Sequence, residues 1–255
     1  MILCLDVGNS HIFGGIFKND KLTLSFRHNT NSGSTSDQIG VFLKNLLREN
    51  NINSNDIAKI AISSVVPSID YSLRAACKKY FGIDPFILSA ATKTGLIMKN
   101  HNPLETGADL IAGAIAATFS HPNKNIIIVD LGTATTLTAI SANKEFLGVS
   151  ILAGLRISVN SLANNTSKLF PFEIQKPEKV TGRFTIESLQ SGLYYSHLGA
   201  IKEITSRMTQ EVFNGENPLL IGTGGFASLF EKEKLFDVII SDLVLHGIRL
   251  GSQAQ

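Results

Sequence analysis

The chain opens with Ile2-Leu3-Cys4-Leu5-Asp6-Val7-Gly8-Asn9-Ser10, and the pattern returns near its middle as Ile126-Ile127-Ile128-Val129-Asp130-Leu131-Gly132-Thr133-Ala134-Thr135-Thr136. Each stretch is an apolar strand that ends in Asp, one apolar residue and Gly, followed by small hydroxyl or amide side chains. The carboxylate at the strand end can hold a cation, and the Gly lets backbone N–H groups approach an anion. Two such turns predict two half-domains that face each other across the phosphates of a nucleotide, which favours ATP chemistry.

The composition excludes several classes of protein. The chain has 255 residues, of which 44% are hydrophobic and 17% charged, which is typical of a soluble globular protein. The net charge of +2, without a Lys/Arg cluster, argues against a nucleic-acid or membrane partner. Cys4 and Cys77 are expected to be buried, reduced thiols. There is no signal-peptide pattern and no apolar run near the roughly 20 residues of a membrane span, so we expect a cytoplasmic protein.

The spacing of apolar residues predicts a duplicated α/β fold. In the first half we expect strands over 2–7, 11–17, 22–26, 57–66, 86–88 and 96–98, and helices over 37–48, 68–80 and 106–119. In the second half we expect strands over 125–130, 133–141, 146–152 and 219–221, an irregular segment over 168–180, and helices over 154–163, 185–212 and 243–250, with another opening at Gly224-Gly225. A break in the long helix would fall at Gly192.

The order βββαβα therefore occurs twice, and Asp130 lies 124 positions after Asp6. We expect an N-terminal half over 1–116 and a C-terminal half over 117–255. By analogy of strand order, these are actin-like (ribonuclease H-like) halves around a central cleft, as in sugar kinases. The analogy names a fold and not a substrate.

Each candidate site has a structural alternative. Asp6 to Ser10 is a candidate phosphate loop or an ordinary hairpin turn, since Asn and Gly are turn residues. Asp130 with the hydroxyls that follow Gly132 is a candidate phosphate or cation site, although Thr is also common in strands. Gly224-Gly225 could let an adenosine ring lie against the backbone, or form a tight turn.

A carboxylate at a predicted helix start is the candidate general base. Thr106-Gly107-Ala108-Asp109 opens a helix, whose N-terminus favours an ionised carboxylate. The alternative is a capping box, with Thr106 as the N-cap and Asp109 three residues on. His11, His197 and His246 are expected to be structural or surface groups, because the histidines show no metal-ligand spacing.

These stretches, in this order, resemble the type III pantothenate kinase family over nearly the whole chain. The motifs that carry the resemblance are Asp6 to Ser10, Ser63-Ser64-Val65-Val66-Pro67, Asn102-Pro103 with Gly107-Ala108-Asp109, Asp130 to Thr136, Ser191-Gly192, Thr223-Gly224-Gly225 and Asp242 to Leu245. The resemblance implies phosphorylation of pantothenate by ATP to 4'-phosphopantothenate, the first step toward coenzyme A. It also implies Mg²⁺, a monovalent cation (K⁺ or NH₄⁺) and a homodimer.

The resemblance also assigns residues to roles. Asp109 looks like the catalytic base, Asp130 like the ligand of the monovalent cation, and Thr185 like a threonine that reaches the neighbouring subunit's substrate site. The implied ATP and phosphate contacts are Asp6 (also toward Mg²⁺), Val7, Gly8, Asn9, Ser10, His11, Gly132, Thr133, Thr135, Gly224 and Gly225. The implied acceptor site comprises Asn100, Gly107, Ala108, Asp109, Leu110 and Thr185.

Four positions depart from the family's pattern. Leu110 stands where Arg usually follows the catalytic Asp, and Asn100 where Tyr is usual; Thr138 replaces a common Asp, and Ala153 a common Pro. Without the Arg, a fork of donors that can bind an anion bidentately is missing. Two alternatives therefore stand beside the pantothenate kinase: a catalytically impaired nucleotide-binding relative with a regulatory role, and a kinase of another small alcohol.

Overall fold

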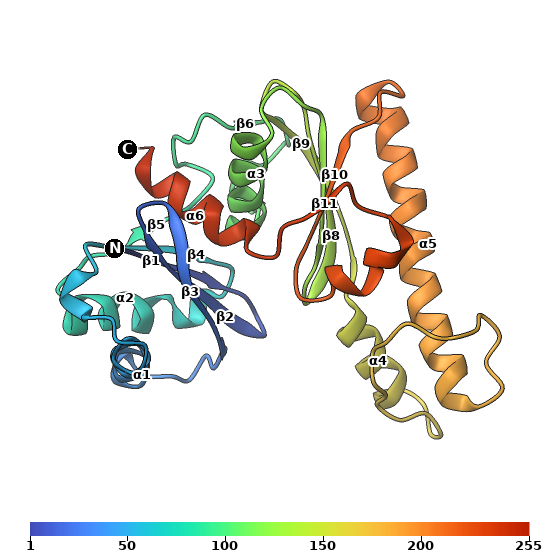
Figure 1. Cartoon of the computed structure of the whole chain (residues 1–255), viewed down its shortest axis with the longest axis horizontal. Coiled ribbons are helices and arrows are strands. Elements are labelled where there is room, and N and C mark those ends of the chain that lie inside the picture. Colours follow the sequence, from blue (N-terminus) through green and yellow to red (C-terminus); the bar gives the residue numbers. More distant parts are fainter. Residues whose placement is uncertain (255) are drawn as a thin grey trace. The chain divides into compact units, whose positions relative to one another are not determined.

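The structure is a computed structural model that describes residues 1–254, and it divides the chain into two compact units. Unit 1 comprises Met1–Gly95, His101–Ala116 and Leu243–Gln255, and unit 2 comprises Leu96–Asn100 and Ala117–Asp242. The expected halves, 1–116 and 117–255, differ from these units at two segments. Residues 96–100 belong to unit 2, and the last helix of the chain belongs to unit 1 (Figure 1).

Unit 1 is built on a five-stranded sheet of order β3-β2-β1-β4-β5. Its strands are β1 (Ile2–Val7), β2 (His11–Lys18), β3 (Lys21–Asn29), β4 (Lys59–Ser64) and β5 (Phe86–Ile87). The first three strands form an antiparallel meander, whereas β4 and β5 run parallel to β1. The meander was expected from its short polar turns, and the parallel strands follow from the helices that connect them.

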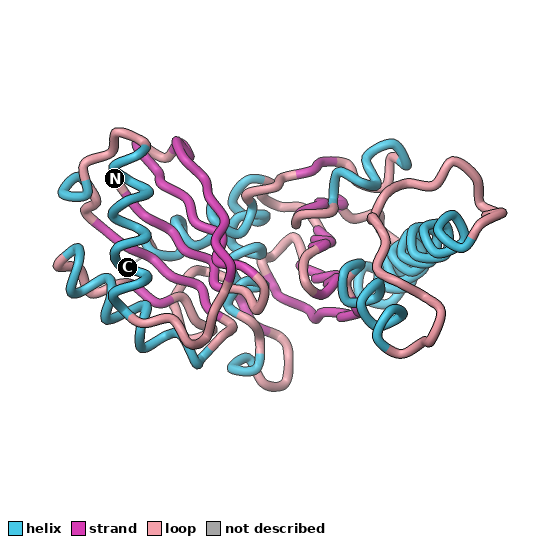
Figure 2. Tube along the Cα trace, turned by 90° about the horizontal axis from the view of Figure 1, so that it is seen from below, coloured by secondary structure: helices cyan, strands magenta, loops and turns pink. Residues whose placement is uncertain are grey.

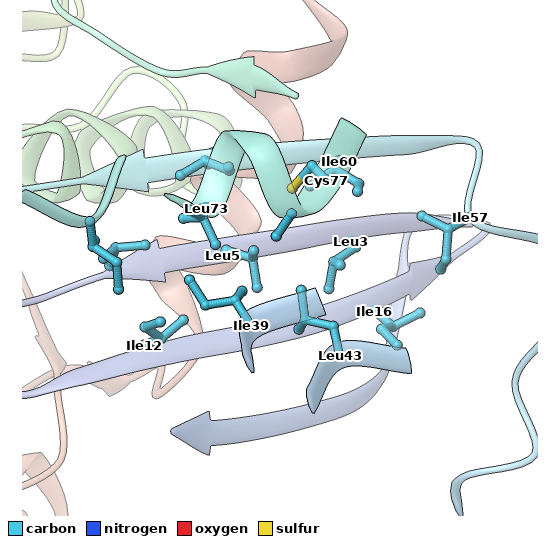
Figure 3. Close-up of a cluster of buried hydrophobic side chains, with 14 of the residues drawn as sticks. Leu3, Leu5, Ile12, Ile16, Ile39, Leu43, Ile57, Ile60, Leu73 and Cys77 are labelled. Carbon is cyan, nitrogen blue, oxygen red and sulfur yellow. The ribbon is translucent and has the colours of Figure 1, made fainter. Parts of the chain in front are cut away.

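Alternation along β1 sends its side chains to opposite faces of the sheet. Leu3 and Leu5 pack with Ile60 of β4 against α1 (Ser36–Glu49) and α2 (Pro67–Phe81), as Figure 3 shows. Cys4 and Asp6 therefore lie on the other face. The thiols of Cys4 and Cys77 are buried and unlinked, as expected, and burial raises the pKa of each to about 12.

The other face of this sheet is covered by α6 (Leu243–Gln253), which packs on β1 and β4. The buried Arg249 forms an ion pair with Asp20 at the β2–β3 turn, and Lys59 of β4 donates to the backbone carbonyl of Ser252. The helix thus joins the end of the chain to its first strands, and both termini lie in unit 1 (Figure 2).

Close packing of α6 depends on Gly247. A Cβ atom there would lie 1.8 Å from the carbonyl oxygen of Ala112, on α3 (Ala108–Ser120). We expect Gly247→Ala to lower the free energy of unfolding by about 1–3 kcal/mol, because backbone must shift to admit the methyl group. Chemical denaturation measures this. Gly199→Ala, a helical site where a Cβ meets nothing within 4 Å, is the control, and we expect it to be neutral or stabilising.

Unit 2 repeats the strand order of unit 1. Its sheet has the order β11-β10-β7-β8-β9-β6, from β7 (Ile126–Leu131), β8 (Ala134–Ile140), β9 (Glu145–Ala153), β10 (Leu219–Thr223), β11 (Val238–Ile239) and β6 (Ile97–Met98). β7 is antiparallel to β8 and parallel to β10, as β1 is to β2 and β4. The predicted duplication is confirmed, and β6 is an additional strand beside β9.

The helices of unit 2 cover one face of its sheet. α4 (Leu155–Asn164) and α5 (Thr185–Phe213) pack on β8, and the buried Leu137, Tyr194 and Ile201 belong to one core cluster. The expected break at Gly192 is wrong, since α5 runs through it; tertiary packing overrides the weak preference of one glycine.

Three short 3-10 helices complete the described elements: η1 (Ser54–Asp56), η2 (Pro103–Glu105) and η3 (Ala227–Glu233). The helix expected to open at Gly224-Gly225 is thus η3, which begins two residues later. Within residues 1–254, no helix combines the length and the apolarity that a bilayer crossing requires.

Candidate functional site

The first Asp-x-Gly turn joins β1 to β2 in unit 1. The N–H of Gly8 donates to the carbonyl of His11 at 3.0 Å and closes the turn. Thr30, just after β3, donates its hydroxyl to the Gly8 carbonyl at 2.6 Å and its N–H to the Ser10 carbonyl at 3.0 Å. Asn9, Ser10 and His11 are exposed. The turn is therefore held from one side while its polar side chains face solvent.

A buried hydroxyl lies beside Asp6. Ser63 of β4 is the register partner of Asp6 across the parallel β1–β4 pair, so the two side chains share a face of the sheet. Ser63 is fully buried, and its Oγ has no hydrogen-bond partner in the described chain. Such orphaned groups are uncommon in folded proteins, and a bound water or ion commonly accounts for them. The hydroxyl and carboxylate suit a hard cation, which prefers oxygen ligands.

The second Asp-x-Gly turn joins β7 to β8 in unit 2, and its carboxylate lies between two glycines. The N–H of Gly132 donates to the carbonyl of Ala134 at 3.1 Å. A Cβ atom on Gly132 would lie 3.3 Å from Asp130 Oδ1, and one on Gly224 only 2.3 Å from it. Gly224 also has a φ of +86°, a region that favours glycine. Gly224 therefore leaves the space that the Asp130 carboxylate occupies.

Hydroxyl groups flank Asp130 on both neighbouring strands. Thr223 of β10 and Thr136 of β8 are its register partners, so all three side chains share one face. The Thr223 hydroxyl donates to the Ile240 carbonyl at 2.6 Å, whereas the buried Thr136 Oγ1 has no partner among residues 1–254. The carboxylate and the unpaired hydroxyl are oxygen donors of the kind that hard cations prefer.

The other threonines of this turn lie differently. Thr133 is exposed at the tip of the turn. Thr135 is fully buried, and alternation places it on the same face as Leu137, toward the core cluster with α4 and α5. A ligand at the turn could therefore meet the side chain of Thr133 but only the backbone of Thr135.

The predicted adenosine turn follows β10 in unit 2. The N–H of Phe226 donates to the carbonyl of Leu131 at 3.2 Å, which ties this turn to the end of β7. Gly225 is exposed, and a Cβ atom there would meet nothing within 4 Å. The Arg156 guanidinium lies 5.8 Å from the Phe226 ring centroid. The backbone at Gly225 is therefore open, with space beside its Cα for at least a methyl group.

Asp109 lies at the start of α3 in unit 1. Its Oδ1 accepts from the N–H of Leu110 at 2.8 Å. A Cβ atom on Gly107 would lie 2.4 Å from that oxygen and 3.4 Å from Cγ1 of Val65. Burial raises the pKa of the Asp109 carboxyl above its usual range, and backbone N–H groups oppose this only in part. The carboxylate is thus held where its charge is disfavoured.

The helix expected to open at Thr106 begins two residues later. α3 begins at Ala108, which makes Gly107 and not Thr106 the residue before the helix. The N–H of Thr106 donates to the Pro103 carbonyl at 3.1 Å. The capping box with Thr106 as the N-cap therefore stays a prediction beside the catalytic role of Asp109.

The remaining predicted residues are divided between the units. Ala108 and Leu110 adjoin Asp109 at the start of α3 in unit 1, whereas Asn100 belongs to unit 2. Thr185 is the exposed first residue of α5. Each unit thus holds part of the predicted set. Thr136 was among the hydroxyls predicted to serve a phosphate or a cation beside Asp130, whereas Ser63 lay within a quoted motif and was not singled out for chemistry. That both hydroxyls lack a partner among residues 1–254 is seen only in the structure.

Two kinds of sequence comparison return the same family. A family model of type III pantothenate kinase matches residues 2–207. A type III pantothenate kinase of Legionella pneumophila (strain Corby) is 60% identical over 252 residues, covering 99% of this chain and 98% of the relative. Type III pantothenate kinase 1 of Francisella tularensis subsp. holarctica (strain OSU18) is 49% identical over 250 residues, covering 98% of both.

Solved structures share the fold at low identity. A Baf family protein from Campylobacter jejuni has a TM-score of 0.60 at 19% identity, covering 98% of this chain and 97% of that one. A ROK family glucokinase from Streptomyces griseus, in complex with glucose and AMPPNP, has a TM-score of 0.51 at 13% identity, covering 99% of both. These likenesses show the duplicated actin-like fold. The sequence matches go further: this chain belongs to the type III pantothenate kinase family.

Proposed function

We propose that this chain uses ATP to phosphorylate the primary hydroxyl of pantothenate, giving 4'-phosphopantothenate in the first step of coenzyme A synthesis. The proposal is carried by one observation. In a chain of this family, the same Asp-x-Gly turn follows the strand that opens each antiparallel meander, β1 with Asp6 and β7 with Asp130. Such turns present backbone N–H groups to an anion, as phosphoryl transfer needs.

The ATP contacts we propose lie in the two Asp-x-Gly turns and in the turn after β10. Val7 to His11 would bind phosphate in unit 1, and Gly132, Thr133 and the Thr135 backbone would do so in unit 2. Gly224 and Gly225 would lie against the adenosine. The exposed side chains of Ser10 and Thr133 and the open backbone at Gly225 support these roles.

Two cations belong to the proposal. Asp6, with the unpaired hydroxyl of Ser63, would hold Mg²⁺, and Asp130, with the unpaired hydroxyl of Thr136, would hold K⁺ or NH₄⁺. These ions would supply positive charge against the phosphate oxygens of ATP. The orphaned, buried hydroxyl beside each carboxylate is the observation that fits this role.

Asp109 would orient the acceptor and accept the proton of its hydroxyl. A carboxyl whose pKa is raised by burial is a better proton acceptor than an exposed one, once it is ionised. Phosphoryl transfer passes through a loose transition state, so most of the acceleration comes from positioning and charge. Gly107, Ala108 and Leu110 would line the same acceptor site, together with Asn100.

The proposal also includes a homodimer in which the two copies share their substrate sites. We place this enzyme in the cytoplasm. Thr185 would enter the site of the second copy from the start of α5, where it is exposed. Unit 2 also exposes large apolar side chains, at Ile151 (65%), Phe184 (72%) and Ile186 (45%). A second copy of the chain would remove such surface from water.

A coupled assay with ATP, Mg²⁺, K⁺ and pantothenate tests the proposal, with Asp109→Asn as the baseline. We expect turnover that falls when Na⁺ replaces K⁺ and returns with NH₄⁺. If the turnover of wild type is no higher than that of Asp109→Asn, the proposal that the chain is a kinase is wrong.

One observation favours a second candidate. Leu110 and Asn100 stand where the family commonly has Arg and Tyr, so a different small alcohol could be the acceptor. A panel of alcohols in the same assay distinguishes it from the pantothenate kinase. ATP binding in calorimetry, without turnover of any of them, would indicate the impaired, regulatory relative.

The seating of the Asp109 carboxylate gives a further prediction. Gly107→Ala places a methyl group 2.4 Å from Asp109 Oδ1, so the carboxylate must turn away. We expect kcat to fall by about 10–100-fold with little change in the KM for ATP, because misplaced catalytic groups reduce the rate of the chemical step. The control is Gly33→Ala, because a Cβ atom there would lie 3.4 Å from the side chain of Asn31, an ordinary contact distance. Gly95→Ala is unsuitable, because the φ of +78° at Gly95 would strain an alanine. An unchanged kcat for Gly107→Ala would contradict the assignment of Asp109.

A further inference from the structure

His197 is a buried histidine in the middle of α5, with only 5% of its surface exposed. Its Nδ1 lies 3.1 Å from the Leu193 carbonyl oxygen, one turn back on the same helix. Its Nε2 lies 3.1 Å from the Ala153 carbonyl oxygen, at the end of β9. One N–H of a neutral imidazole can donate to either carbonyl, and an imidazolium donates to both. The ring therefore joins the helix to the last residue of the strand.

The residue after this carbonyl touches the second Asp-x-Gly turn. A Cβ atom on Gly154 would lie 2.1 Å from the Thr133 carbonyl oxygen and 2.8 Å from that of Gly132. Ala153 is also the register partner of Ala134, at the start of β8. The backbone at 153–154 thus lies directly against the turn, without an intervening side chain. A shift of the Ala153 carbonyl would be transmitted to Gly132 and Thr133.

The surroundings of His197 make this link specific. Its neighbours on α5, Tyr194, Leu198 and Ile201, are buried in the apolar core cluster of unit 2. A polar ring in such a cluster is stabilised only where its N–H groups have partners, and the Ala153 carbonyl is the partner outside its own helix. The sequence predicts that His197 is a structural or surface group, and its two contacts make a structural role more definite.

We propose that His197 is a positioning residue for the turn at Gly132–Ala134: its Nε2–H holds the Ala153 carbonyl, which keeps Gly154 against the turn. The inference rests on the proposed function in that the turn is taken to contact ATP. Its role is indirect, since the ring touches the strand end and not the turn itself.

Two substitutions distinguish the role of Nε2 of His197 from that of Nδ1. Asparagine carries an N–H close to the position of Nδ1 but does not reach Ala153, whereas glutamine carries one near Nε2. We expect His197→Asn to raise the KM for ATP about tenfold, which corresponds to one lost hydrogen bond, with the KM for pantothenate unchanged. His197→Gln retains the link and stays close to wild type. A general loss of structure would move both KM values and would not be rescued by glutamine.

The matched control is Ser196→Ala, the adjacent residue of α5, whose hydroxyl donates only to the Leu193 carbonyl of its own helix, at 3.1 Å. We expect it to leave the KM for ATP unchanged. If His197→Asn does not fold, His197→Met, which fills the space without an N–H, replaces it. Hydrogen exchange of the peptide over residues 131–136 gives a readout besides activity. Exchange there rises in the Asn or Met variant and not in the Gln variant.

The outcomes are distinguishable. Unchanged exchange at 131–136 in His197→Asn, or equal defects in the Asn and Gln variants, would overturn the positioning role. An unchanged KM for ATP in an active enzyme would do so as well. If wild type shows neither ATP binding nor turnover, the proposed function fails, and the exchange experiment still decides whether His197 holds the turn.

Discussion

Asp109→Asn is expected to remove nearly all turnover and leave the folded protein at least as stable as wild type. A positioned general base contributes typically about 10²–10⁴-fold to the rate, and asparagine cannot accept the proton. The amide oxygen of asparagine can still accept the Leu110 N–H bond at 2.8 Å. Burial raises the pKa of Asp109, which means that the folded state disfavours its charge. A neutral side chain relieves this cost, so the free energy of unfolding stays equal or rises.

The pH dependence follows from the same shift. Because the pKa of Asp109 is higher in the folded than in the unfolded state, its contribution to stability is greatest at low pH and is lost as pH rises through the folded pKa. Activity needs the ionised form, so kcat/KM falls as pH drops through that value. The acid limb of wild type then lies above the ordinary Asp pKa of about 3.9.

Steady-state assays across pH, with urea denaturation of both proteins, measure these effects. If Asp109→Asn unfolds more easily than wild type, the Asp109 carboxylate stabilises the fold. If Asp109→Asn has the kcat of wild type, Asp109 is not the general base.

The sequence predicted the duplicated sheets because the deciding features are local. An apolar strand that ends in Asp-x-Gly, followed by two strands with short polar turns, specifies the same meander at both positions. Long-range pairings could not be predicted in this way. β6 (Ile97–Met98) lies in the first half of the sequence but pairs with β9, and α6 returns from the last residues to pack on β1. Neither contact leaves a pattern in the neighbouring residues.

The residues of the candidate site also differ in how far the sequence predicts them. Asp6, Asp109 and Asp130 stand out because each is a charged residue at the end of an apolar strand or the start of a helix. The partners of these carboxylates do not stand out. The importance of Gly107 and Gly224 depends on where a carboxylate oxygen lies in space. Whether a buried hydroxyl such as that of Thr136 is paired, and which carbonyl His197 meets, also depends on tertiary packing.

Gly224→Ala is expected to weaken both the fold of unit 2 and ATP binding. At a φ of +86° an alanine is strained, and its Cβ would lie 2.3 Å from Asp130 Oδ1 and 2.7 Å from the backbone of Leu131. The strain of a left-handed residue and the overpacking together lower the free energy of unfolding by about 2–4 kcal/mol. Because the carboxylate of Asp130 must also move, we expect the Kd for a non-hydrolysable ATP analogue to rise at least about tenfold.

The neighbouring glycine is a matched control for stability, because it shares the turn and lacks both constraints. A Cβ atom on Gly225 meets nothing within 4 Å, and its φ is not positive. We expect Gly225→Ala to leave the free energy of unfolding unchanged or slightly raised, because alanine restricts the unfolded chain. Denaturation of both variants, and calorimetry of Gly224→Ala with the ATP analogue and K⁺, give the comparison. Wild-type affinity in a folded Gly224→Ala protein would mean that the Asp130 carboxylate, displaced by the new methyl group, has no part in holding the nucleotide.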